Sequence, residues 1–145
     1  NRKKIQGLGG YRREDARRWD QMKPFCEIVV AKILPAMRAI ITKELMQTYG
    51  LNQVEAAQRL GITQPAISQY SRELRGYNVK LLRSNKKIMN EIKELTANIA
   101  SGDTKSNKIP EKFCDICGKI RKERIICKLH ESNYPSIKPC NSCFR

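Results

Sequence analysis

Cysteine residues gather near the end of the chain, where their spacing is that of metal ligands. Five of the six cysteines lie there: Cys114, Cys117, Cys127, Cys140 and Cys143. Cys114 and Cys117 form one Cys-x-x-Cys pair, Cys140 and Cys143 form a second, and 22 residues separate the two pairs. Four thiolates arranged in this way suit the tetrahedral coordination of a structural zinc ion. Because Gly118 follows the first pair, we expect a zinc-knuckle turn there.

This segment offers more candidate ligands than one tetrahedral site needs. Cys127 and His130 make a third pair with the same spacing, so six side chains compete for four places. Cys127 could replace a terminal cysteine as a ligand. His130, the only histidine, is expected to be exposed or to contact a ligand without binding the metal itself. We favour zinc, and the alternative cofactor is an iron–sulfur cluster that senses redox state or oxygen, since it also accepts four thiolates. Disulfide bonds are disfavoured because we expect a reducing compartment.

The composition favours a polyanionic partner and excludes several classes of protein. The chain of 145 residues carries 29 Lys and Arg against 14 Asp and Glu, a formal net charge of +15. Lys and Arg that neutralise phosphates release counterions, so nucleic acid is a natural partner. No apolar run approaches the ~20 residues of a membrane span and no signal peptide is visible, so we expect a cytoplasmic or nucleoid-associated protein without a membrane partner. An enzyme is not expected, because there is no serine–histidine–carboxylate set and no glycine-rich phosphate loop.

Two short helices joined by a glycine turn are predicted between residues 52 and 74. Asn52 can cap the first helix by accepting a backbone N–H of its first turn. Val54, Ala57 and Leu60 recur at helical spacing and are expected to form its buried face. Gly61 stands where the helix needs a residue that tolerates a positive φ in order to end.

The second helix is predicted to follow Thr63, which can cap it, with Pro65 in the first turn, where no helical donor is needed. Its inward positions are Ile67, Tyr70 and Leu74. Its outward positions are mostly hydrogen-bonding side chains: Gln64, Pro65, Ser68, Gln69 and Arg72. A hairpin that served only for packing would not need this amide-rich face, so we interpret the face as a binding surface.

Residues 53–72 resemble a helix-turn-helix of the Cro and phage-repressor type. Ala57 stands at the small position of that motif and Gly61 at its turn. Ile62 stands at an apolar position, and Ile67 and Tyr70 at inward positions. Together with residues 26–35 and the cysteine cluster, the arrangement resembles predicted archaeal transcriptional regulators. The resemblance implies a protein that binds operator DNA and changes transcription.

That resemblance implies that the helix from residue 63 to residue 74 lies in the major groove of double-stranded DNA. Gln64 and Gln69 are suited to adenine, since a carboxamide can donate to N7 and accept from the N6 amino group. Arg72 is suited to guanine or to a phosphate. Thr63 and Ser68 are expected to contact phosphates or base edges. Pro65 is expected to contact a thymine methyl group.

The chain is expected to be mainly α and to divide into four segments. Residues 1–24 form a basic arm, in which Arg12 and Arg17 are expected to contact phosphates. Residues 25–100 form the helix-turn-helix domain, and residues 101–110 form a linker. Residues 111–145 are too few to build a sufficient core from side chains alone, so we expect a small cysteine-rich domain held by its metal.

Two longer helices are expected to complete the DNA-binding domain. One spans about residues 25–49, and Pro35 is expected to break or kink it. The other spans about residues 79–100 and carries an apolar stripe: Ile88, Ile92, Leu95 and Ile99. The stripe would either cover the helical core or pair with the same helix of a second subunit. We expect a homodimer, because helix-turn-helix proteins commonly bind as dimers with recognition helices ~34 Å apart.

Two other functions stay open at this stage. The cysteine domain could dock onto the transcription machinery, with the helix-turn-helix mediating protein contacts, which would make the protein an adaptor. A basic zinc-bearing tail could also bind RNA. Phe113, Tyr134 and Phe144 are too scattered to make a base-stacking platform, which disfavours RNA.

Overall fold

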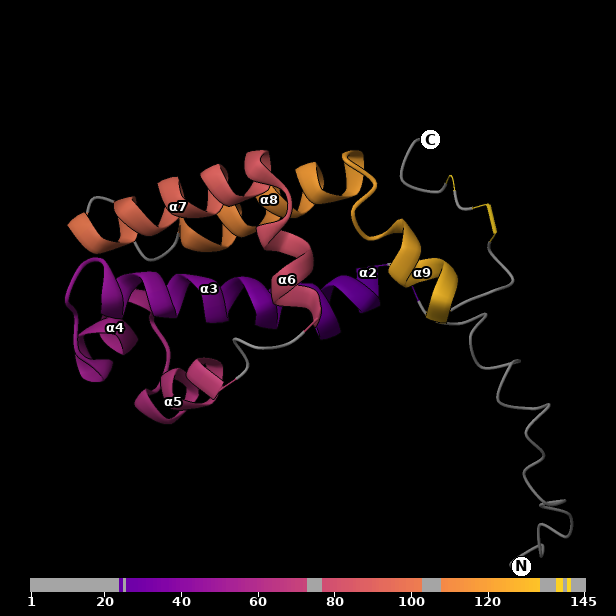
Figure 1. Cartoon of the computed structure of the whole chain (residues 1–145). Coiled ribbons are helices and arrows are strands. Elements are labelled where there is room, and N and C mark those ends of the chain that lie inside the picture. The colour runs from indigo at the N-terminus through magenta and orange to yellow at the C-terminus, as the bar shows by residue number, and fades with distance from the viewer. Residues whose placement is uncertain are drawn as a thin grey trace, which may run out of the picture.

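The computed structural model describes residues 24, 26–72, 77–102, 108–133, 138–139 and 141, and Figure 1 draws the whole chain. Within these residues the structure is mainly helical, which confirms the mainly α part of the predicted fold class but not its metal-held domain. Its elements are α2 (Cys26–Ile28), the π-helical segment η2 (Val29–Ile33), α3 (Leu34–Gln47), α4 (Gln53–Leu60), α5 (Gln64–Arg72), α6 (Tyr77–Arg83), α7 (Lys86–Ser101), α8 (Ile109–Lys122) and α9 (Cys127–Asn133). The predicted basic arm with Arg12 and Arg17, Leu74, and the pair Cys140 and Cys143 lie outside the described residues.

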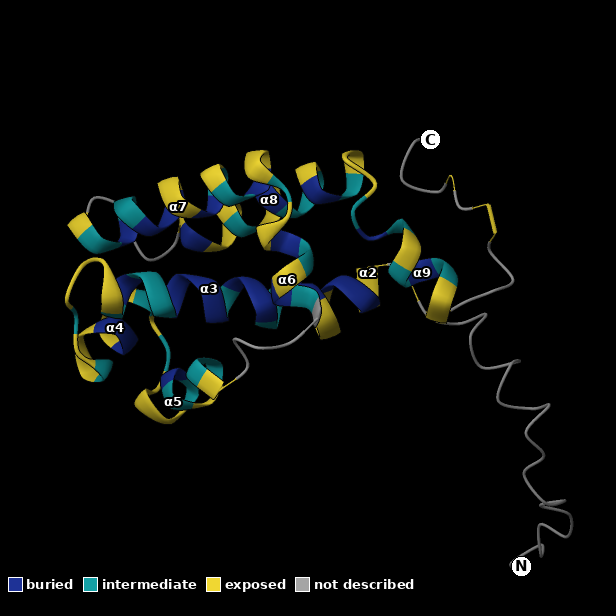
Figure 2. Cartoon of the chain, in the orientation of Figure 1, coloured by how far each residue is buried: buried dark blue, intermediate teal, exposed yellow. Residues whose placement is uncertain are grey.

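The central element is α3, which contacts α5 on one side and α7 on the other. Figure 1 shows α4 and α5 below it and α7 and α8 above it. Half of the 14 residues of α3 are buried and are dark blue in Figure 2: Ala36, Met37, Ala39, Ile40, Ile41, Thr42 and Leu45. A helix that is apolar over most of its surface must be covered on several sides, and here the other helices cover it.

Pro35 sets the point at which α3 begins. It lies in the first turn of α3, and the preceding residues 29–33 are π-helical, with the Leu34 N–H donating to the Val29 carbonyl. Proline has no N–H and its ring clashes with the carbonyl four residues earlier, which would be that of Ala31 in an α-helix. The wider π-helical turn relieves this clash. The chain stays helical from Cys26 to Gln47, so the irregularity predicted at Pro35 takes the form of a π-helical segment and not of a break.

Helix α4 begins and ends where the sequence indicated. The Asn52 side chain accepts the Glu55 N–H at 2.9 Å, and the Glu55 carboxylate accepts the Asn52 N–H at 2.8 Å, which completes a capping box. At the other end Gly61 has φ 66°, in the left-handed region that favours glycine. Both ends of this helix are set by local chemistry.

Replacing Asn52 by alanine should lower the free energy of unfolding by about 1 kcal/mol, because one first-turn donor of α4 then loses its partner. Urea denaturation followed by circular dichroism measures this change. Asn90→Ala is the matched control, since Asn90 is exposed in the middle of α7 and caps nothing, and we expect a change of less than about 0.5 kcal/mol. Equal losses in the two variants would contradict the capping role.

The predicted helix over residues 79–100 is in fact two helices, α6 and α7. The break lies at Asn85, whose backbone is extended (φ −100°, ψ 106°) and whose side chain accepts the Ile88 N–H at 3.1 Å. Asparagine competes in this way with helical hydrogen bonds and so starts a new helix. The apolar stripe of α7 is buried within the chain: Ile88, Ile92, Leu95 and Ile99. It covers the core, so it is not a surface for pairing with a second subunit.

Helix α8 packs against α7 and shares its core. Ile109, Ile116 and Ile120 are buried in the same apolar cluster as the residues of α3. Two ion pairs join the helices at the surface, Lys119 to Glu91 at 2.6 Å and Lys87 to Glu123 at 3.4 Å. This packing differs from the separate, metal-held unit expected from residue 111 onward. The physical reason is that these isoleucines recur at helical spacing, so α8 can bury one face without a metal.

Among the described residues, no helix combines the length and the apolar character needed to cross a lipid bilayer.

Candidate nucleic-acid interface

Helices α4 and α5 meet through a tight turn of three residues. The Ile62 N–H donates to the Ala57 carbonyl at 3.0 Å, and the Ala66 N–H donates to the Thr63 hydroxyl at 3.4 Å. Ala56 and Ala57 on α4 are buried, and α4 contacts α5, α3 and α7. The turn therefore fixes the direction in which α5 leaves α4.

Ile67 anchors α5 to the rest of the molecule. Its side chain is fully buried, and α5 contacts α3 as well as α4. Tyr70 is half-buried, and its hydroxyl accepts a long hydrogen bond from Arg38 on α3 at 3.5 Å. A helix held along one side in this way presents a rigid opposite face, which is the requirement for precise positioning of binding groups.

The opposite face of α5 carries the residues that the sequence assigned to DNA. Five of the six assigned positions at the turn and on α5 are exposed: Thr63, Gln64, Pro65, Gln69 and Arg72. The sixth, Ser68, is half-buried. In Figure 2 this outer side of α5 carries the exposed colour, whereas the side toward the core is buried. These side chains therefore share one accessible surface of a short, anchored helix.

A second glutamine holds Gln64 in place. The Gln64 Nε2 group donates to Oε1 of Gln53, which stands at the start of α4 and is half-buried. A carboxamide has two N–H donors and one acceptor oxygen, so Gln64 keeps one donor and its oxygen available. Sequence reasoning missed Gln53, because no local spacing rule relates positions on two different helices.

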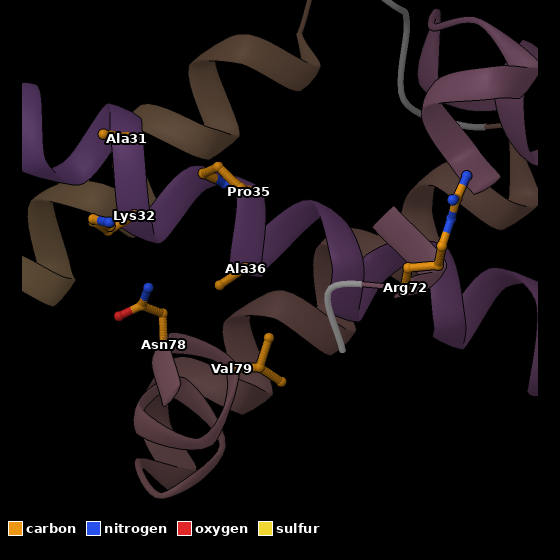
Figure 3. Close-up of a pocket in the computed structure, with 7 residues that line it drawn as sticks. All are labelled: Ala31, Lys32, Pro35, Ala36, Arg72, Asn78 and Val79. Carbon is orange, nitrogen blue, oxygen red and sulfur yellow. The ribbon is translucent and has the colours of Figure 1, made fainter. Parts of the chain in front are cut away.

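Arg72 is the last residue of α5 and is exposed. Its Nε–H donates to the Ser68 carbonyl at 3.5 Å, which is a weak contact. Arg72 also lines the rim of a shallow pocket of about 460 Å³ beside η2. Figure 3 shows Lys32 and Asn78 facing each other across that pocket, while the Arg72 side chain points away from them. Its guanidinium is thus accessible to an external partner.

One residue of the predicted buried face of α4 is exposed. Val54 is 56% exposed, whereas Ala56 and Ala57 are buried and Leu60 is half-buried. The inward face of this short helix includes both of its alanines. The prediction that Val54 is buried was wrong.

The described cysteines lie on three helices, with Cys26 on α2 and the others on α8 and α9. Cys114, exposed, and Cys117, half-buried, stand three positions apart within α8, so the predicted knuckle turn is instead part of a regular helix. Cys127, half-buried, is the first residue of α9. His130, expected to be exposed or behind a ligand, is buried on α9. Cys26 and these three cysteines form no disulfide with one another.

The described residues supply at most half of a four-thiolate site. Residues three apart on a helix have Cβ atoms ~5–6 Å apart, so Cys114 and Cys117 can reach one metal ion together. No group of three or more His, Cys, Asp or Glu side chains converges among the described residues. A complete zinc site would therefore need Cys140 and Cys143, both outside the described part of the chain.

Gly118 provides a test of the helix around these cysteines. An added Cβ would have no neighbour within 4 Å, and a glycine within a helix is less stable than alanine by about 0.5–1 kcal/mol. Gly118→Ala should therefore raise the free energy of unfolding by about that amount. A zinc knuckle that needs a left-handed glycine there would instead be destabilised, so a loss of stability and of bound metal would contradict the helix.

The chain matches no protein-family model, no curated protein and no solved structure.

Proposed function

We propose that this protein binds double-stranded DNA sequence-specifically, with α5 in the major groove, and regulates transcription. The observation that carries the proposal is the division of α5 into two sides. Ile67 is fully buried against the body of the protein, whereas Gln64, Gln69 and Arg72 are exposed. The major groove is wide enough to admit an α-helix, and it presents a distinct pattern of donors and acceptors for each base pair.

Gln64 and Gln69 are the proposed base-reading residues. Gln53 orients the Gln64 carboxamide through a hydrogen bond and leaves it the one donor and one acceptor that a bidentate contact with adenine requires. A group that is already oriented loses less conformational freedom on binding. Gln69 is exposed just over one helical turn further along α5, so it addresses a neighbouring base pair.

The excess of positive charge supplies the affinity that does not depend on sequence. Arg72 stands at the end of α5, and Arg12 and Arg17 are assigned to phosphates from the basic arm. With a net charge of +15, the chain should bind any duplex at low salt, and binding should weaken steeply as salt rises. Specificity must then come from the face of α5.

Selection of preferred duplexes from a random pool, followed by titration, tests this function. We expect the selected duplex to bind roughly 10³-fold or more tightly than a random duplex at physiological salt. Single-stranded RNA is the competing partner and should bind no better than the random duplex. Equal affinity for selected and random duplex, or a preference for RNA, would refute the proposal. A selected site with two inverted halves would support the expected homodimer.

The cysteine pairs are proposed to hold one zinc ion, with Cys114 and Cys117 on α8 and Cys140 and Cys143 from the last residues. Bound zinc would tie those residues to α8 and add stability to the fold. Metal analysis of the purified protein should find one zinc per chain. Cys114→Ser should reduce the zinc content, whereas the control Cys26→Ser should not, because Cys26 lies exposed on α2. A brown protein that contains iron would instead identify the iron–sulfur alternative.

A further inference from the structure

An apolar groove runs between the helix-turn-helix and the start of α8. Its volume is about 590 Å³, within the ~300–1,000 Å³ that is typical of pockets for small molecules. Six apolar side chains line it: Leu34, Leu60, Ile62, Ile109, Pro110 and Phe113. They come from α3, from the end of α4 and its turn, and from the first turns of α8. The groove therefore joins segments that are far apart in the sequence.

Arg38 is the one basic side chain in this lining, which also includes Gly61 and the proposed zinc ligand Cys114. It projects from α3, one helical turn after Leu34, and is half-buried. Its guanidinium makes a long hydrogen bond of 3.5 Å to the Tyr70 hydroxyl and forms no ion pair with any carboxylate of the described residues. A half-buried guanidinium is stabilised by an anion that accepts its paired N–H groups. The groove thus combines an apolar surface with one cation that lacks a counter-charge within the described fold.

We propose that this groove binds an apolar monocarboxylic acid, such as a medium-chain fatty acid. The carboxylate accepts hydrogen bonds from Arg38, whose planar fork matches carboxylate geometry. The hydrocarbon part packs against Leu60, Ile62 and Phe113. A phosphorylated ligand fits less well, because Arg38 alone supplies positive charge to the lining residues.

Calorimetric titration of the full chain with decanoate, kept below the concentration at which it forms micelles, tests the proposal. Decanol has the same chain without the charge, and decylamine carries the opposite charge. Hydrogen bonds to charged groups predict that decanoate binds roughly ten- to a hundred-fold more tightly than decanol, and that decylamine binds more weakly still. Equal binding of all three probes would overturn the proposal, because the groove would then recognise apolar surface alone.

Arg38→Met removes the cation and keeps an apolar side chain of similar length. This variant should lose roughly ten- to a hundred-fold in affinity for decanoate while its affinity for decanol is unchanged. Arg83→Met is the matched control, because Arg83 is exposed on α6 and does not line the groove. An equal loss in both variants would show that decanoate binds the basic surface in general, which would overturn the proposal.

The position of the ligand is measured separately by NMR on the unmodified protein, so the test does not depend on a variant that folds. Bound decanoate should shift the methyl resonances of Leu34, Leu60 and Ile62, and should leave those of Val30 unchanged, because Val30 is exposed on η2. Shifts that avoid the groove would overturn the proposal. Neither measurement uses DNA, so their outcome is independent of the proposed DNA binding.

Discussion

Replacing Ile120 by alanine should lower the free energy of unfolding of the whole helical fold by about 2–5 kcal/mol. Ile120 on α8 is fully buried in the cluster that also holds the core residues of α3 and α7. Truncation removes buried methyl groups and leaves a cavity that closely packed neighbours fill only in part. The loss should therefore spread beyond α8 and reach helices far away in the sequence.

Urea denaturation measures this loss, with circular dichroism for the helices and methyl NMR signals of Ile40 for α3. Val54→Ala is the matched control, because Val54 is 56% exposed and its truncation should cost less than about 0.5 kcal/mol. If the Ile120 variant lost only the structure beyond residue 108 while α3 unfolded as before, the cysteine-rich segment would be an independent unit.

Replacing Gln69 by alanine should cost about 1–3 kcal/mol in binding to the preferred duplex and nothing in binding to a random duplex. Gln69 is exposed on the outer face of α5, so its removal leaves the fold intact and deletes a bidentate contact with one base. The loss should appear as relaxed discrimination at a single position of the selected site. Fluorescence anisotropy with duplexes mutated one base pair at a time measures it.

Gln58→Ala is the control for this experiment. Gln58 is an exposed carboxamide on α4, so the chemical change is the same but lies away from the proposed recognition face. It should leave the affinity for both duplexes unchanged within about 0.5 kcal/mol. An unchanged affinity of the Gln69 variant for its preferred duplex would show that this face does not read bases.

Helices α4 and α5 could be predicted closely because their limits depend on neighbouring residues. Asn52 caps α4 through Glu55, three positions away, and Gly61 ends the helix through its own backbone freedom. Pro35 likewise acts on the turn that precedes it. These effects operate within one or two helical turns, so the sequence alone contains them.

Features that depend on distant packing were harder to predict. The inward face of α4 depends on the helices that pack around it, α3, α5 and α7, and Val54 proved to be exposed. The segment around Cys114 was interpreted from its cysteine spacing, yet the isoleucines of α8 pack on α7 and form a helix there. The hydrogen bond between Gln53 and Gln64 also joins two helices, so its partner is visible only once the turn is folded.

NMR of the isotope-labelled protein, titrated with the selected duplex, tests the central claim most directly. We predict that the side-chain amide signals of Gln64 and Gln69 and the Nε–H signal of Arg72 shift most strongly with the selected duplex, and that the two amide signals do not shift with a random duplex. If these signals stayed unchanged while the shifts fell on α8 and α9, α5 would not be the surface that meets DNA.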